Sequence, residues 1–124
     1  MGPSVAREIA CPPEVAWRLL THVDEWPRWG PTVAGGSVPG GVISSGASGT
    51  VRTAVGVSLP FVVTRFEEGR SWAWRVAGVP ATTHRVTPTE DGCVVTFGVP
   101  LWAPGYLPVC ALALLRIERL AAES

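Results

Sequence analysis

Residues 50–99, TVRTAVGVSLPFVVTRFEEGRSWAWRVAGVPATTHRVTPTEDGCVVTFGV, decide the fold. The stretch consists of runs rich in Val, Thr, Phe and Trp, which are residue types that favour β-strands. Short breaks separate the runs, at Gly56, Glu68-Gly69, Val79-Pro80 and Asp91-Gly92. Strands joined by such short connections run antiparallel. The stretch therefore predicts an antiparallel meander with strands at 50–55, 58–67, 70–78, 81–88 and 93–99.

The chain before the meander begins with a strand and a helix. A strand over residues 5–11 ends at Pro12-Pro13, and proline suits the first turn of a helix because its missing N–H would be unpaired there. The helical spacing of apolar residues that follows predicts a short amphipathic helix, with Pro13, Ala16, Trp17 and Leu20 on one face. Pro27 limits residues 24–29 to a short helical turn.

The two remaining segments differ in character. Residues 31–49 are rich in Gly, Ser and Pro, and they predict a loop with a short strand around 42–44 at most. Residues 104–122 carry an apolar stripe at alternating spacings of four and three, which predicts a long helix buried along one side. The whole order fits one α+β domain over residues 1–124, a curved antiparallel sheet with a long helix across its concave face.

Composition excludes several classes of protein. The 124 residues are 47% hydrophobic and 16% charged, with zero formal net charge and no lysine. No cluster of arginines offers a surface for nucleic acid. No apolar run reaches the roughly 18 residues that span a bilayer, and the N-terminus lacks a secretory signal pattern, so we expect a cytoplasmic protein without an integral membrane segment. Cys11, Cys93 and Cys110 lie far apart, which predicts free thiols and no metal site.

Several stretches resemble one family over nearly the whole chain. They are EIACPPEVAW (8–17), DEWPRWGP (24–31), VT (63–64), RSWAW (70–74), THRV (83–86) and RIERLAAE (116–123). They are similar to the START/Bet v 1-like (SRPBCC) superfamily, in particular its polyketide cyclase/dehydrase and lipid-transport branch. The resemblance implies a helix-grip fold. In that fold a curved seven-stranded antiparallel sheet wraps around a long C-terminal helix, two short helices follow the first strand, and a cavity binds hydrophobic ligands.

His84 is the candidate catalytic residue. Strand alternation puts Thr82, His84 and Val86 on one face, and in the family the position of His84 is directed at the cavity. Histidine titrates near neutral pH and can act as acid or base. Desolvation in the cavity should disfavour its charged form. The structural alternative is a histidine that hydrogen-bonds a neighbouring strand and carries out no chemistry.

We expect aromatic and apolar side chains to line the cavity, because rings offer large apolar area and hydrogen-bonding edges. The alternative is that these side chains only fill the core. Arg65 should face solvent, whereas Arg52 could bind a ligand oxygen if it faced the cavity. The predicted ligand-binding residues are Trp26, Trp29, Phe66, Trp72, Trp74, His84, Phe97, Tyr106, Cys110 and Leu114.

Two main functions are compatible with this sequence. The first is a carrier or sensor that binds a small hydrophobic or aromatic molecule, lipid-like or polyketide-like, as a monomer or homodimer without a cofactor. The second is a cofactor-free cyclase or dehydratase that uses His84 as acid or base. No nucleophile motif, phosphate-binding loop or Schiff-base lysine is present. A third possibility is a protein-interaction module that uses exposed aromatics near Trp102 to Tyr106.

Overall fold

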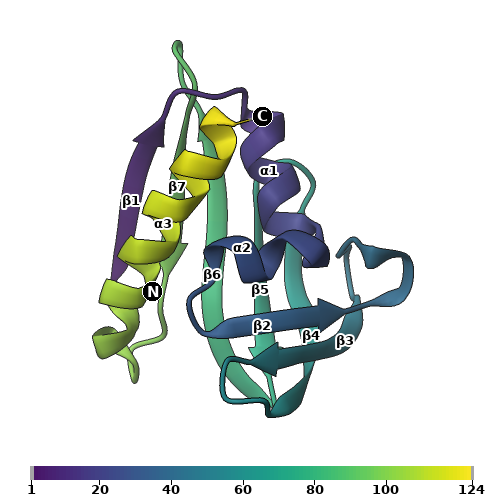
Figure 1. Cartoon of the computed structure of the whole chain (residues 1–124). Coiled ribbons are helices and arrows are strands. Elements are labelled where there is room, and N and C mark those ends of the chain that lie inside the picture. The colour runs from purple at the N-terminus through teal and green to yellow at the C-terminus, as the bar shows by residue number, and fades with distance from the viewer. Residues whose placement is uncertain (1, 124) are drawn as a thin grey trace.

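A computed structural model describes residues 2–123 and is built around one seven-stranded antiparallel sheet (Figure 1). The strand order is β1-β7-β6-β5-β4-β3-β2, so the first strand pairs with the last and the second lies at the opposite edge. This arrangement confirms the α+β helix-grip fold. The strands are β1 (Ser4–Ile9), β2 (Val33–Ser37), β3 (Ser48–Thr53), β4 (Ser58–Glu67), β5 (Ser71–Val76), β6 (Val79–Pro88) and β7 (Cys93–Gly98).

Helices cover part of the concave face of the sheet. The long C-terminal helix lies over β1 and β7, and the first helix lies beside it over β6 (Figure 1). Within residues 2–123, none of the helices is long and apolar enough to cross a membrane. The helical elements are α1 (Pro13–Thr21), η1 (Val23–Glu25), α2 (Trp26–Trp29), η2 (Pro39–Gly41), η3 (Pro104–Tyr106) and α3 (Leu107–Ala122).

The buried stripe of α3 follows helical periodicity. Its buried residues are Cys110, Ala113, Leu114, Ile117 and Ala121, and side chains three and four positions apart share one face of a helix. Tyr106 and Leu120, near the two ends of the helix predicted over 104–122, are only partly buried. The apolar spacing in the sequence therefore identified the buried side of the helix.

Two tryptophans hold α2 against α1. The indole Nε1 of Trp26 donates a 2.9 Å hydrogen bond to the Leu20 carbonyl, and that of Trp29 donates a 2.8 Å bond to the Leu19 carbonyl. These carbonyls lie in the last turn of α1, where the helix itself supplies no partner. The short helix α2, which contains Pro27, is thereby fixed by side chains rather than by its own length.

The prediction of a loop over residues 31–49, with a strand only around 42–44, was wrong. A strand forms over Val33–Ser37, while Val42 makes just an isolated bridge to His22. Glycine lets the backbone of β2 approach the core closely, because a Cβ at Gly36 would lie 2.9 Å from the Trp26 ring. Strand propensity misses this segment, since Gly36 is required by packing against Trp26.

The turn predicted at Val79-Pro80 lies two residues earlier. Ala77 and Gly78 have φ values of 52° and 79°, and two successive positive φ values are the signature of a type I′ hairpin turn. Val79 and Pro80 are the first residues of β6, where Pro80 is exposed and is paired with Arg75. Glycine at position 78 suits the turn, and proline is accommodated near the start of the strand.

Candidate ligand-binding site

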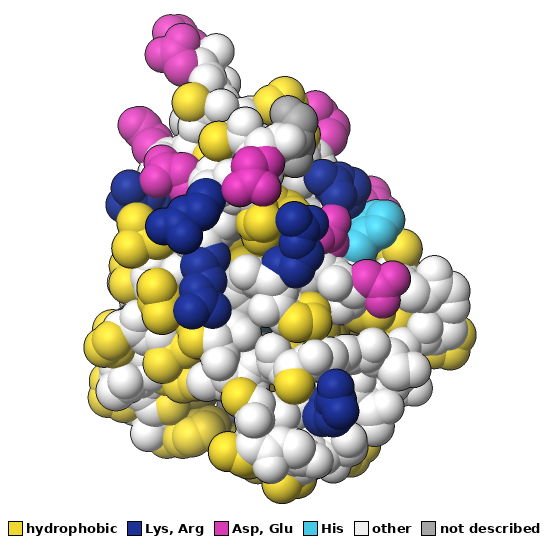
Figure 2. Space-filling view, viewed as in Figure 1, with side chains coloured by type: hydrophobic (Ala, Val, Ile, Leu, Met, Phe, Trp, Pro, Cys, Tyr) yellow, Lys and Arg dark blue, Asp and Glu magenta, His cyan; other side chains and the backbone are white. Residues whose placement is uncertain are grey.

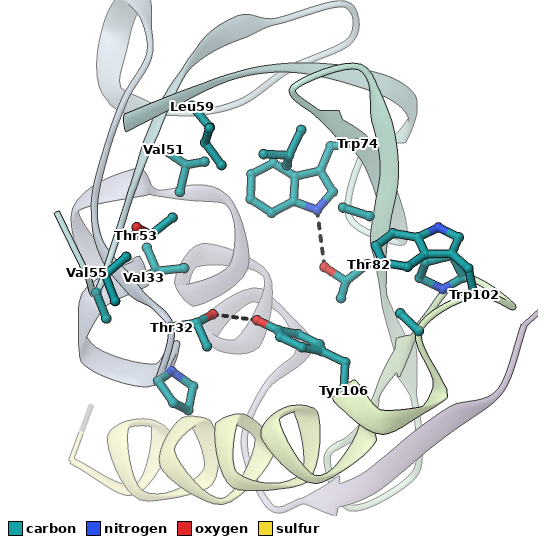
Figure 3. A pocket seen from close by; sticks show the side chains of 16 residues that line it. Thr32, Val33, Val51, Thr53, Val55, Leu59, Trp74, Thr82, Trp102 and Tyr106 are labelled. Atoms are coloured by element: carbon teal, nitrogen blue, oxygen red, sulfur yellow. Dashed lines mark hydrogen bonds between the residues drawn. The ribbon is translucent and has the colours of Figure 1, made fainter. Parts of the chain in front are cut away.

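An outer pocket of about 460 Å³ opens between the inner faces of β2 to β6, the segment after α2 and the loop before α3 (Figure 3). Its walls are almost entirely apolar, and the polar groups in them are hydroxyls and indole N–H groups. Arginine, histidine, aspartate and glutamate are absent from the lining. The lining residues are Pro31, Thr32, Val33, Val51, Thr53, Ala54, Val55, Leu59, Trp74, Val76, Ala81, Thr82, Pro100, Trp102, Ala103 and Tyr106.

A second, much smaller space, the inner cavity, adjoins the outer pocket. It measures about 50 Å³ and shares six lining residues with the pocket: Pro31, Thr32, Val33, Trp74, Thr82 and Tyr106. The α3 helix reaches the inner cavity through residues 109–113. The rest of its wall is Gly30 and a set of five residues that we call the aromatic cluster: Trp26, Trp29, Trp72, His84 and Phe97.

The rings of the aromatic cluster are in direct contact. Trp72 and His84 are paired across β5 and β6, and their rings stack with centroids 4.0 Å apart. Trp26 also stacks on Trp72, with 5.8 Å between the two ring centroids. Phe97 meets His84 edge to face at 5.0 Å. Such contacts stabilise the fold beyond simple apolar burial.

The hydrogen bonds of His84 determine its tautomer. Its Nδ1 lies 3.4 Å from the Trp72 carbonyl oxygen, which can only accept, so Nδ1 carries the hydrogen. Its Nε2 lies 3.0 Å from the Thr82 hydroxyl and accepts the hydrogen of that group. The Thr82 oxygen in turn accepts a 3.2 Å hydrogen bond from Trp74 Nε1 (Figure 3). Both ring nitrogens of His84 are thus engaged within the protein.

Burial keeps His84 neutral. The side chain is 3% exposed, and desolvation lowers its pKa from 6.5 to about 3, against a small opposing effect of the Trp72 carbonyl. A neutral imidazole agrees with one nitrogen donating and the other accepting. The arrangement is that of a histidine built into the sheet, with the Thr82 hydroxyl between it and the outer pocket.

Thr32 and Tyr106 join opposite walls at the junction of the two spaces. Their hydroxyl oxygens are 2.5 Å apart (Figure 3). Burial raises the pKa of the Tyr106 phenol, and the Thr32 hydrogen bond opposes this only in part. Tyr106 therefore stays protonated at neutral pH and can act as a hydrogen-bond donor.

The predicted ligand-binding residues lie at three depths. Trp74 and Tyr106 line both spaces, whereas Phe66 and Leu114 line neither. A shift in strand register after Val63 turns Phe66 toward Trp17 of α1, and their ring centroids are 5.8 Å apart. Leu114 is 1% exposed and packs in the core. The predicted residues that border only the inner cavity are Trp26, Trp29, Trp72, His84, Phe97 and Cys110.

Two arginines lie away from the pocket, whereas two threonines that the sequence did not identify line it. Arg52 and Arg65 are both exposed, so Arg52 does not supply a cation to the pocket. Thr82 was placed on the same strand face as His84 by alternation but was not identified as a lining residue. Thr32 lies outside any regular element, and nothing in the sequence pattern marks it. In residues 2–123, no three His, Cys, Asp or Glu side chains come together as a metal site.

Comparisons with known proteins identify the fold and the family. Among solved structures, a protein from Mesorhizobium loti superposes with a TM-score of 0.79 at 18% identity, over 100% of this chain and 98% of the other. The Aha1 dimer from Colwellia psychrerythraea gives 0.71 at 18%, over 98% and 96%. These likenesses show a shared fold. The sequence has no significant match among curated proteins. Residues 4–108 match the family described as polyketide cyclase / dehydrase and lipid transport, and the chain belongs to that family.

Proposed function

We propose that this domain, residues 1–124, binds a small, uncharged, mainly apolar molecule in the outer pocket, as a carrier or sensor. The observation that carries the proposal is the lining of the pocket, which is large, apolar and free of charged side chains. Apolar pockets with a few placed polar groups are the usual form of small-molecule sites. A charged group buried there would lose its hydration without finding a partner, so the ligand should be neutral.

The alternative function, a cofactor-free cyclase or dehydratase, has less support. It needs an acid or base that reaches the ligand, and His84 was the candidate. Both nitrogens of His84 are hydrogen-bonded to Trp72 and Thr82, and its pKa of about 3 leaves it uncharged at neutral pH. The ring borders only the inner cavity. These features favour a structural role for His84 and binding without reaction.

The test uses Nile red, an uncharged apolar dye whose fluorescence rises in apolar surroundings, and two variants of β4. Leu59 faces the outer pocket, whereas Val62 on the same strand is 38% exposed. Leu59→Trp should fill part of the pocket and weaken Nile red binding about tenfold, the equivalent of a clash of about 1.4 kcal/mol. Val62→Trp adds more bulk on the outer face and should leave the affinity unchanged.

Two results would contradict the proposal. One is wild-type protein that leaves Nile red fluorescence unchanged at saturating concentration. The other is equal affinity of wild type and Leu59→Trp, which would put the dye elsewhere on the molecule. Circular dichroism of each variant establishes that the fold is intact before the titrations are compared.

A further inference from the structure

Two hydrogen-bond donors at the inner cavity have no acceptor within the described residues. The first is Trp72 Nε1. Trp72 is only 2% exposed, and its Nε1 makes no hydrogen bond. The second belongs to the Thr32 and Tyr106 pair. Two hydroxyls in one hydrogen bond use a single hydrogen, so the accepting hydroxyl keeps its own. Trp72, Thr32 and Tyr106 all line the inner cavity.

The acceptors of the same cavity are mostly occupied. His84 Nε2 accepts from Thr82, and the Thr82 oxygen accepts from Trp74. An unpaired buried donor is unfavourable compared with the same group in a hydrogen bond. The inner cavity therefore has an excess of donors over acceptors, and its volume of about 50 Å³ suits one oxygen atom with its immediate neighbours.

We infer that the inner cavity is an anchoring subsite for the carbonyl oxygen of an uncharged ligand, such as a ketone, ester or lactone. A carbonyl oxygen has two lone pairs and can accept from the hydroxyl pair and from Trp72 together. The apolar remainder of the ligand lies in the adjoining outer pocket, through the junction at Trp74, Thr82 and Tyr106. This inference rests on the proposed function and names the ligand class for the same site.

Charge separates this class from carboxylic acids. His84 is neutral, and neither space is lined by an arginine. A carboxylate placed at the inner cavity would meet donors but no cation, and its desolvation would be uncompensated. A neutral carbonyl has no such cost and should be selected over the acid of the same size.

The experiment compares three naphthalenes that differ in one substituent: 2-acetylnaphthalene, 2-isopropenylnaphthalene and 2-naphthoate. The ketone and the hydrocarbon have nearly the same shape. Calorimetry should show the ketone binding about tenfold more tightly than the hydrocarbon, with the carboxylate weakest. Infrared spectra of the bound ketone should show its carbonyl stretch at lower frequency than in hexane, because hydrogen bonds weaken the C=O bond.

The double variant Thr32→Val with Tyr106→Phe removes both hydroxyls, since either one alone would keep a hydrogen to donate. It should reduce the preference for the ketone several-fold. It should also move the carbonyl stretch part of the way back to its frequency in hexane. Thr64→Val, which removes an exposed hydroxyl of β4 that lines neither space, is the matched control and should change neither. Trp72→Phe, which removes the other donor, should abolish the remaining part of the shift in the carbonyl frequency.

The outcomes separate this inference from the proposed function. If the ketone and the hydrocarbon bind wild type equally well, the carbonyl subsite is wrong and the apolar pocket stands. If none of the three naphthalenes binds, both the carbonyl subsite and the proposed ligand-binding function are contradicted. Equal ketone preference in wild type, the double variant and Trp72→Phe would also overturn the inference, because the donors would then have no role.

Discussion

The aromatic cluster and the outer pocket lie on the concave side of the same sheet, yet side chains pack closely in the cluster and leave an open space in the pocket. Around the aromatic cluster, α1, α2 and α3 bring their buried faces onto the sheet, and rings meet at 4.0 to 5.8 Å. Over the outer pocket the cover is mainly loop, from 31 to 33 and from 100 to 106. An apolar sheet face can thus stabilise the fold at one end and hold a ligand at the other.

The surface divides in a related way. Charged side chains gather over the upper part of the molecule, around α1 and the C-terminal half of α3, while the lower part, over β2 and β3, carries few (Figure 2). One ion pair there joins Arg7 of β1 to Glu118 of α3 at 2.9 Å. Exposed apolar side chains instead occur beside the pocket, where Val55, Leu101 and Trp102 are 85%, 76% and 65% exposed. The end of the molecule that contains the aromatic cluster therefore has the more polar surface.

The largest expected effect is a loss of stability caused by a change in the aromatic cluster. Trp26→Ala removes a ring that stacks on Trp72, packs against Gly36 and donates to Leu20. The cavity left behind should lower the free energy of unfolding by about 3–5 kcal/mol. Urea denaturation followed by circular dichroism measures it. A loss below 1 kcal/mol would mean that the aromatic cluster is not the stabilising half.

A smaller effect concerns pH and His84. The pKa of His84 is 6.5 in the solvated unfolded chain and about 3 when the side chain is buried. As pH falls below 6.5, the unfolded chain therefore binds a proton that the folded protein does not bind. The contribution is complete above pH 6.5 and is lost progressively toward pH 3. Between pH 7 and 5 this one group should reduce stability by about 2 kcal/mol.

The variant His84→Phe isolates that contribution. It keeps a ring in the cluster and removes the titrating nitrogens, so its stability should change less between pH 7 and 5 than that of wild type. Val86→Ala, which changes another buried residue of β6 and keeps the imidazole, is the control and should retain the wild-type dependence. If wild type and His84→Phe show the same pH dependence, His84 is not held neutral by burial.

The smallest effect on stability is expected at the rim of the pocket. Trp102 is 65% exposed and lines the outer pocket, so Trp102→Ala should change the free energy of unfolding by less than about 0.5 kcal/mol. Its ring should still contact a bound dye, and loss of that contact should weaken Nile red about two- to tenfold. The reverse pattern, with stability lost and affinity kept, would assign Trp102 to the core.

Sequence patterns located the elements better than they located the site. Alternation on β6 placed His84 and Val86 inward, and helical spacing identified the buried stripe of α3, because both depend on local periodicity. The prediction that Phe66 lines the cavity failed because a register shift after Val63 interrupts the alternation. Thr32 escaped because its partner, Tyr106, is distant in sequence and only the tertiary fold brings the hydroxyls together.

The pairing of β1 with β7 has a consequence for how the chain reaches its native state. Ser4 is opposite Gly98 and Ile9 is opposite Cys93, and α3 then packs over the same strands. The hairpins from β3 to β7 can form between near neighbours as the chain is made, but β1 must wait for a segment more than eighty residues later. Such non-local closure slows folding. During synthesis, β1 therefore stays without its strand partner until β7 has left the ribosome.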